Sequence, residues 1–288
     1  MPPTKAERAD FNRLVSLIVS NELADTTLLV GQNNYTLNYY VDRGDDEAMS
    51  YLLREKRPIE KGWGLYAIRL NSSSNIIVEA PHPLFDRRTP SVALDIYRAL
   101  DARALLIAGA HRNANGTGTA DAAHDKNTIF HTVHETLSKD IAATSGDVVV
   151  LQIHGFHTSK HDGYPAVVIG FGREIQPAES LLAQELEAAL VERGVNVGLC
   201  TGDVWLDLCG AKNVQAAAMG GGAFLHIEMD EELRRNDDAL IEALMQVFGR
   251  SCFNKEQGRT LNVRPCFRSG VFFTAPGSPV PRRSGWHS

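Results

Sequence analysis

The chain contains an apolar run, Asn75-Ile76-Ile77-Val78-Glu79-Ala80-Pro81-His82, that predicts a buried β-strand ending in a histidine. A second run, Val148-Val149-Val150-Leu151-Gln152-Ile153-His154, repeats this pattern. A third, Ala223-Phe224-Leu225-His226-Ile227-Glu228, ends in a glutamate. Short apolar runs rich in valine and isoleucine are typical of strands buried inside a sheet. We therefore expect these three runs to form the centre of a β-sheet.

Strands and helices are predicted to alternate around these runs. Further strands are expected at residues 64–70, 104–109 and 165–170, and helices at 89–100, 125–139, 179–192 and 230–248. Thr89 and Pro90 are expected to begin the first of these helices, as its capping residue and its first helical residue. This alternation favours an α/β fold, namely a single three-layer domain with a mixed, mostly parallel central sheet and helices on both faces.

Both ends of the chain are predicted to be extensions of this domain. Residues 1–62 are expected to form an N-terminal cap or edge element, with a helix at 5–20 and a short helix from Asp45 through Leu53. Residues 63–250 are expected to form a catalytic α/β domain. Residues 251–288 hold four prolines and show no clear periodicity, which predicts an extended tail.

The composition is that of an ordinary soluble globular protein, with 43% hydrophobic and 22% charged residues. A formal net charge of −6 argues against nucleic acid as the main partner. No apolar run approaches the length of a transmembrane helix, and the first residues lack the apolar core of a secretory signal. We therefore expect a cytoplasmic location and no membrane partner.

The cysteines are spaced too widely for a Cys-x-x-Cys zinc pattern. In a cytoplasmic protein the simplest expectation is that all four are reduced thiols, with a Cys252–Cys266 bridge only in an oxidising compartment. The four are Cys200, Cys209, Cys252 and Cys266.

The ends of the apolar runs carry side chains that bind metals. His82 and His154 end the first two runs, and Asp86 follows His82 by four residues. Because the carboxyl ends of parallel strands meet at one edge of a sheet, these side chains are expected to converge. Two imidazoles and a carboxylate suit a catalytic zinc, which takes three protein ligands and keeps one open position. A lone histidine would more often be an ordinary polar residue, but this combination predicts a Zn²⁺ site of His82, Asp86 and His154, with Glu228 handling protons.

A rival metal set lies within the predicted helix 125–139. His131 and Glu135 share one helical face, and His134 lies beside them. The order of the residues is not the His-Glu-x-x-His pattern of zinc peptidases, so a polar helix face near the active site is the preferred interpretation.

Arg112 stands in the polar loop that follows the strand at 104–109. Its guanidinium could bind a substrate carboxylate or an oxyanion. It could equally form an internal ion pair with Asp121 or Asp125. Both interpretations stay open.

The segment from Pro81 to Ala93 resembles the first metal motif of zinc amidohydrolases related to the carboxypeptidases. The nearest groups are poly-γ-glutamate hydrolases, N-formylglutamate amidohydrolases and N-acetylmuramoyl-L-alanine amidases. By position, His82 resembles the first ligand and Asp86 the carboxylate ligand. Residues 152–155 are similar to the later strand-end histidine motif, and residues 226–228 to the strand that carries the catalytic glutamate.

The resemblance covers roughly residues 75–248 and has departures. Aspartate stands where the poly-γ-glutamate hydrolases have glutamate, the loop between the two ligands is shorter, and prolines replace glycines. Asp95, on the following helix, therefore remains a second candidate for the carboxylate ligand.

Together these features predict a zinc-dependent hydrolase of the amidohydrolase or metallopeptidase type, acting on a small, anionic, peptide-like substrate. Zinc would polarise the carbonyl and activate water, Glu228 would transfer the water proton to the leaving amine, and Arg112 would hold an anionic group or the oxyanion. One alternative is a non-catalytic protein that binds a small anion on a hydrolase-like fold. Another is a phosphoester hydrolase, which usually requires more carboxylate ligands. The sequence makes no prediction of the oligomeric state.

Overall fold

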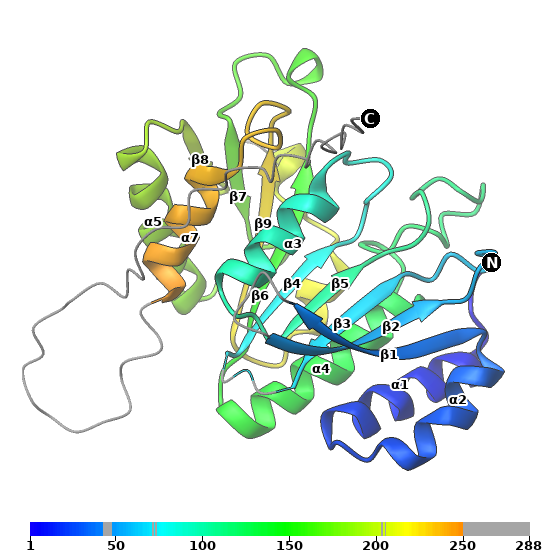
Figure 1. Ribbon diagram of the computed structural model, residues 1–288. Helices are drawn as coiled ribbons and strands as arrows, with labels where there is room; N and C mark the ends of the chain where they lie inside the picture. Colours follow the sequence, from blue (N-terminus) through cyan, green and yellow to red (C-terminus); the bar gives the residue numbers. More distant parts are fainter. Residues whose placement is uncertain (43–47, 71, 73, 203, 205, 250–288) are drawn as a thin grey trace, which may run out of the picture. The chain divides into compact units, whose positions relative to one another are not determined.

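The computed structural model describes residues 1–42, 48–70, 72, 74–202, 204 and 206–249 (Figure 1). The predicted tail, residues 251–288, lies outside the described residues. The described part contains a sheet of nine strands in the order β1-β2-β3-β5-β4-β6-β9-β7-β8. The strands are β1 Tyr35–Asp42, β2 Ala48–Glu55, β3 Leu65–Arg69, β4 Ile76–Ala80, β5 Ala104–Ile107, β6 Val149–Gly155, β7 Val167–Gly170, β8 Val197–Leu199 and β9 Ala223–Met229.

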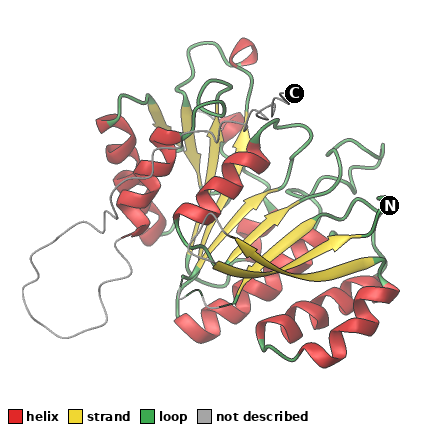
Figure 2. Cartoon of the chain, in the orientation of Figure 1, coloured by secondary structure: helices red, strands yellow, loops and turns green. Residues whose placement is uncertain are grey.

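Helices cover both faces of the sheet (Figures 1 and 2). The α-helices are α1 Lys5–Val19, α2 Thr26–Gln32, α3 Thr89–Ala99, α4 Ile129–Ser145, α5 Pro177–Glu192, α6 Val214–Ala218 and α7 Asp238–Phe248. Buried side chains of α3, α5 and α7 share one core with Val78, Leu151 and Leu225, whereas those of α1 and α4 share another with Ile77 and Val150. Because neighbouring residues of a strand face opposite sides, the apolar runs are buried on both. The predicted three-layer α/β fold is confirmed.

The centre of the sheet is parallel. Strands β5, β4, β6 and β9 are neighbours that all run in the same direction, and β3 and β7 flank them in the antiparallel direction. The carboxyl ends of these four strands therefore meet at one edge, the place where ligands of α/β sheets bind. The prediction of a mixed, mostly parallel central sheet holds for this central part.

The N-terminal segment differs from its prediction. Residues 48–53 are not helical but belong to β2, which pairs with β1 and β3 in the antiparallel direction. Tyr51 and Leu53 are buried, two residues apart, which is the period of a strand rather than of a helix. Residues 45–47, expected to begin that helix, lie outside the described residues. β1 and β2 form one edge of the same sheet, and the domain boundary at residue 62 stays a prediction.

Two helices begin later than predicted. α4 spans Ile129–Ser145 because the side chain of Thr128 accepts a hydrogen bond from the backbone of His131 and so caps the helix at this point. α7 begins at Asp238, because Asp230 instead accepts a bond from the backbone of Leu233 and holds residues 230–235 in turns.

The cysteine prediction was wrong for one pair. Cys200 and Cys209 form a disulfide, with their Cα atoms 5.7 Å apart. Sequence spacing alone gives no sign of this bridge. Cys252 and Cys266 lie outside the described residues. Among the described helices, none combines the length and the hydropathy needed to cross a bilayer. The cytoplasmic location stays a prediction.

Candidate active site

A pocket of about 400 Å³ lies at the carboxyl edge of the central strands. His82 lies two residues past the end of β4, and His154 and Glu228 are register partners on the parallel strands β6 and β9. All three side chains line the pocket, together with Arg112, Ala123, His124, Asp207, Gly210, Ala211, Lys212, Asn213 and His226. The fold therefore brings four of the predicted metal and catalytic residues, His82, His154, Glu228 and Arg112, into one cavity.

Asp86 is held close to both histidines by a tight turn. Its backbone N–H donates to the carbonyl of His82 at 2.8 Å, and the hydroxyl of Thr89 donates to the carbonyl of Asp86 at 2.8 Å. Thr89 is thus the first residue of α3, and the predicted capping position belongs to Arg88. Arg234 donates to the carbonyls of Arg87 and Phe156 and ties this turn to the end of β6.

The spacing of the predicted ligand atoms fits a zinc ion. Oδ2 of Asp86 lies 3.4 Å from Nδ1 of His82 and 3.1 Å from Nδ1 of His154, and all three side chains are buried. Tetrahedral zinc with ligands at about 2.0–2.1 Å separates its ligand atoms by roughly 3.3 Å. The two distances from Asp86 therefore match the separation that such an ion requires, and the ligand atoms of the three residues all lie within 4.8 Å of one another.

The outer ring nitrogens support the same conclusion. Nε2 of His82 lies 2.8 Å from Oδ1 of Asp121, and Nε2 of His154 lies 2.8 Å from Oε1 of Gln152. A neutral imidazole that donates from Nε2 keeps a lone pair on Nδ1. Two lone pairs and a carboxylate oxygen then converge on one point, where a cation satisfies all three. This donor set fits zinc.

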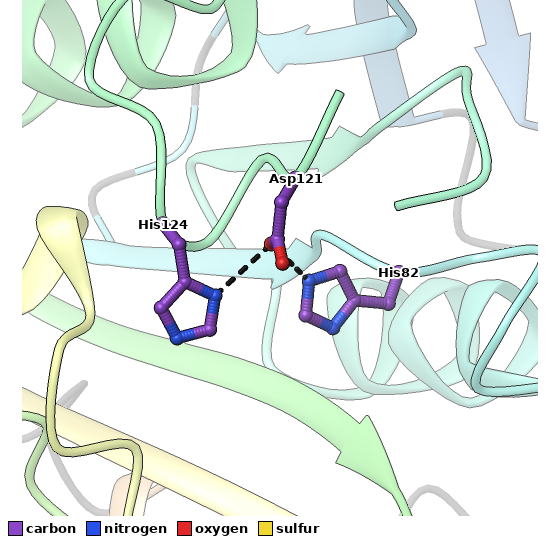
Figure 3. A group of neighbouring side chains, drawn as sticks. All are labelled: His82, Asp121 and His124. Carbon is purple, nitrogen blue, oxygen red and sulfur yellow. Dashed lines mark hydrogen bonds and ion pairs between the residues drawn. The ribbon is translucent and has the colours of Figure 1, made fainter. Parts of the chain in front are cut away.

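Asp121 lies between two histidines near the pocket, His82 and His124 (Figure 3). Its Oδ1 contacts His82 and, at 3.1 Å, Nδ1 of His124, and its Oδ2 accepts a bond of 2.6 Å from Arg112. The ion pair left open by the sequence is therefore formed with Asp121. Arg112 still lines the pocket, with Nη1 3.4 Å from Nδ1 of His82.

Ionisation within the site follows burial and these contacts. Burial, assisted by the nearby His226, lowers the pKa of His154 to about 4, so this imidazole is neutral near pH 7. Burial also acts to lower the pKa of His82, but its bonds to Asp121 and Asp86 outweigh burial and raise the pKa. Burial acts to raise the pKa of Asp86, yet its close contacts with the His154 and His82 imidazoles hold that pKa well below its usual range. The carboxylate is thus charged, as a metal ligand must be.

Glu228 lies beside the predicted metal ligands and is almost completely buried. Its Oε1 is 3.3 Å from Nε2 of His226, and its Oε2 has no hydrogen-bond partner among the described residues. The ring of His226 lies 4.2 Å from that of His154, measured between centroids. Sequence reasoning noted His226 only as part of a strand. Its position two residues before Glu228 was the available signal, because such residues share one face of a strand.

Three overlapping groups of potential metal ligands occur in the described part of the chain. Both carboxylate oxygens of Asp121, in the first group, are already engaged, Oδ2 by Arg112 and Oδ1 by the two histidines. His226 and Glu228 of the third are already paired with each other. The remaining group combines matching ligand spacing with outward hydrogen bonds on both rings. The groups are His82, Asp121 and His124; His154, His226 and Glu228; and His82, Asp86 and His154.

The other sequence candidates lie elsewhere. None of the metal-binding groups found among the described residues includes Asp95, His131 or His134. His134 instead contacts Glu79, with Nδ1 2.7 Å from Oε1, and His131 lies 3.8 Å from Glu135. The structure therefore places Asp86, rather than Asp95, beside the two histidines.

Replacing His131 with glutamine is expected to make the free energy of unfolding fall less as the solution becomes acidic. Burial, followed by the neighbouring His134, lowers the pKa of His131 from 6.5 to about 4. The unfolded chain therefore binds more protons between these two values, so the free energy of unfolding falls as the pH falls through this window. A shift of this size corresponds to on the order of 3 kcal/mol.

Urea unfolding at neutral pH and near pH 4 measures this difference for wild type and for His131→Gln. His157→Gln, which changes an exposed histidine, is the control and is expected to behave as wild type. If wild type and His131→Gln lost equal amounts of free energy of unfolding between neutral pH and pH 4, protonation of His131 would not be the cause of that loss.

No protein-family model matches the chain, and no curated protein matches its sequence. Similar solved structures include an N-formylglutamate amidohydrolase from Ralstonia eutropha, at 16% identity and a TM-score of 0.44, covering 66% of this chain and 97% of that one. A bacteriophage poly-γ-glutamate hydrolase is 14% identical, with a TM-score of 0.43 and coverages of 67% and 92%. A metallo-carboxypeptidase from Burkholderia cenocepacia is 12% identical, with a TM-score of 0.38 and coverages of 87% and 70%. The first two bear the names of groups that the sequence motifs resemble.

Proposed function

We propose that the chain is a zinc-dependent hydrolase that cleaves an amide or peptide-like bond. The observation that carries this proposal is the convergence of Nδ1 of His82, Nδ1 of His154 and Oδ2 of Asp86, each an acceptor, on one buried point. Glu228 stands in register with His154 on the next strand, so a group that can accept a proton lies beside that point.

The roles of the chain's own residues follow from their contacts. When bound, zinc supplies a Lewis acid that polarises a carbonyl and activates water. Glu228 is the general base, and its oxygen without a hydrogen-bond partner, Oε2, is the atom that takes the proton. The same carboxyl group then returns the proton to the leaving amine. His226 holds the other oxygen and limits rotation of the carboxylate.

The pocket suits a small anionic substrate. Its volume of about 400 Å³ is in the range of small-molecule sites. Arg112 and Lys212 line it with positive charge, although Arg112 shares its charge with Asp121. We assign Arg112 to a carboxylate of the substrate or to the oxyanion, and Lys212 to the attraction of negative charge.

The test is an assay of zinc-loaded protein against N-acyl amino acids, short peptides and phosphoesters. Release of free amine from an N-acyl amino acid or a peptide, abolished by a chelator and restored by zinc, is the expected result. Cleavage of phosphoesters alone would contradict the proposed reaction. Zinc binding with no turnover of any substrate would instead favour the non-catalytic anion-binding protein.

A further inference from the structure

A buried row of polar side chains runs behind the pocket, across the centre of the sheet. Glu79 on β4 is the register partner of Gln152 on β6, and Gln152 is the register partner of His226 on β9. Glu79 and Gln152 are fully buried, although both are polar residues within otherwise apolar runs. A buried carboxylate is costly unless hydrogen bonds compensate for the lost hydration. Glu79 therefore needs hydrogen-bond partners that compensate for its lost hydration.

The hydrogen bonds of Glu79 fix the orientation of Gln152. Its Oε2 accepts a bond of 2.9 Å from the amide nitrogen of Gln152, while its Oε1 contacts Nδ1 of His134 at 2.7 Å. The Oε2 atom of Glu79 is the acceptor of this bond, so the amide nitrogen of Gln152, its donor, is the end that faces Glu79. The amide oxygen then points the other way, toward His154. Asn213 also donates to this oxygen, which supports the same orientation.

The orientation of Gln152 in turn decides which nitrogen of His154 carries the proton. Oε1 of Gln152 lies 2.8 Å from Nε2 of His154 and can only accept. A neutral imidazole has one N–H, so the proton belongs on Nε2 and the lone pair on Nδ1. Nδ1 is the atom that lies 3.1 Å from Asp86.

We propose that Glu79 is a positioning residue, which acts through Gln152 to hold His154 in the tautomer that presents Nδ1 to the metal. This inference rests on the proposed function. His82 and His154 then share one design: the outer nitrogen of His82 meets the carboxylate of Asp121 directly, and that of His154 reaches the carboxylate of Glu79 through one amide.

Replacing Glu79 with methionine is the first test. Methionine has a similar length but accepts no strong hydrogen bond, so the amide nitrogen of Gln152 loses its nearer acceptor and keeps only Oε1 of Gln215, at 3.3 Å. Zinc affinity, measured by competition with a chromophoric chelator, is expected to fall about 10–100-fold, as for other residues that orient a metal ligand. Glu135→Met is the matched control, because it removes a carboxylate on α4 that pairs with His131 instead. Its zinc affinity is expected to equal that of wild type.

A double variant separates orientation from packing and from net charge. Glu79→Gln combined with Gln152→Glu exchanges the two side chains, conserves charge and volume, and places a carboxylate directly on Nε2 of His154. Zinc affinity is expected to return to near the wild-type value. A loss in the exchange variant equal to that in Glu79→Met would indicate a purely structural role and overturn the inference.

A measurement on the unaltered protein covers the case in which the variants do not fold. Nitrogen-15 spectra of the zinc-loaded wild type distinguish ligation through Nδ1 from ligation through Nε2. Ligation of His154 through Nδ1 is expected, and ligation through Nε2 would overturn the inference. Wild-type affinity in folded Glu79→Met would overturn the inference alone, whereas a wild-type protein that binds no zinc would overturn the proposed function as well.

Discussion

Replacing Glu228 with glutamine is expected to lower kcat for amide hydrolysis about 10²–10⁴-fold, the range for loss of a general acid–base group. Glutamine has nearly the same size but cannot take a proton from water. Glu228 is absent from the group formed by His82, Asp86 and His154, so zinc affinity is expected to stay near the wild-type value. Steady-state kinetics with the best N-acyl substrate and chelator competition measure the two quantities.

Glu232→Gln is the matched control for this variant. Glu232 lies in the acidic stretch that follows β9, is exposed, and does not line the pocket. Its kcat is expected to equal that of wild type. A wild-type kcat in Glu228→Gln, or an equal loss in both variants, would remove Glu228 from the mechanism.

Replacing Asp86 with alanine is expected to have the largest effect on the metal. Asp86 supplies the negative charge of the proposed set, and its Oδ2 lies between the Nδ1 atoms of His82 and His154. Its removal leaves two neutral imidazoles facing the cation. We expect zinc affinity to fall by more than about 100-fold, beyond the usual effect of losing a residue that only orients a ligand. Activity at limiting zinc is expected to fall in parallel.

Asp95→Ala provides the comparison for Asp86→Ala, because Asp95 is the other carboxylate that the sequence offered. It lies on α3, within no group of converging metal-binding side chains in the described part of the chain. Zinc affinity is expected to be unchanged in Asp95→Ala. The reverse pattern, with wild-type affinity in Asp86→Ala and a large loss in Asp95→Ala, would transfer the ligand role to Asp95. Circular dichroism and thermal unfolding confirm that each variant is folded.

The parts of the site that stand at strand ends are readable from the sequence. An apolar run that ends in His82 or His154 predicts both a strand and the edge at which its last side chain emerges, because parallel strands share that edge. The same reasoning predicts that Glu228, at the end of the third apolar run, emerges at this edge. Asp86 can also be predicted, since it is the fourth residue after His82 and a single turn closes that distance.

Other parts are not readable, because loops and side-chain pairings have no periodicity. Asp121 contacts His82 although the two are 39 residues apart in sequence, and the local sequence pattern does not predict this contact. The role of Gln152 also depends on Glu79, its partner on another strand, although a polar residue inside an apolar run was a visible sign. The helix predicted through Leu53 failed because the acidic residues at 45–47 resemble a helix start, whereas the residues after them alternate as a strand.

The register of β6 and β9 implies a separation between chemistry and recognition. His154 and Glu228 are register partners on two adjacent parallel strands of one sheet, so their spacing changes only if the sheet itself opens. Arg112 and Lys212, in contrast, stand on loops at the rim of the pocket. Loops accept substitutions and insertions more readily than central strands. Changes at the rim could therefore alter which ligands the pocket accepts, while the spacing between His154 and Glu228, the proposed metal ligand and the proposed base, is inherited intact.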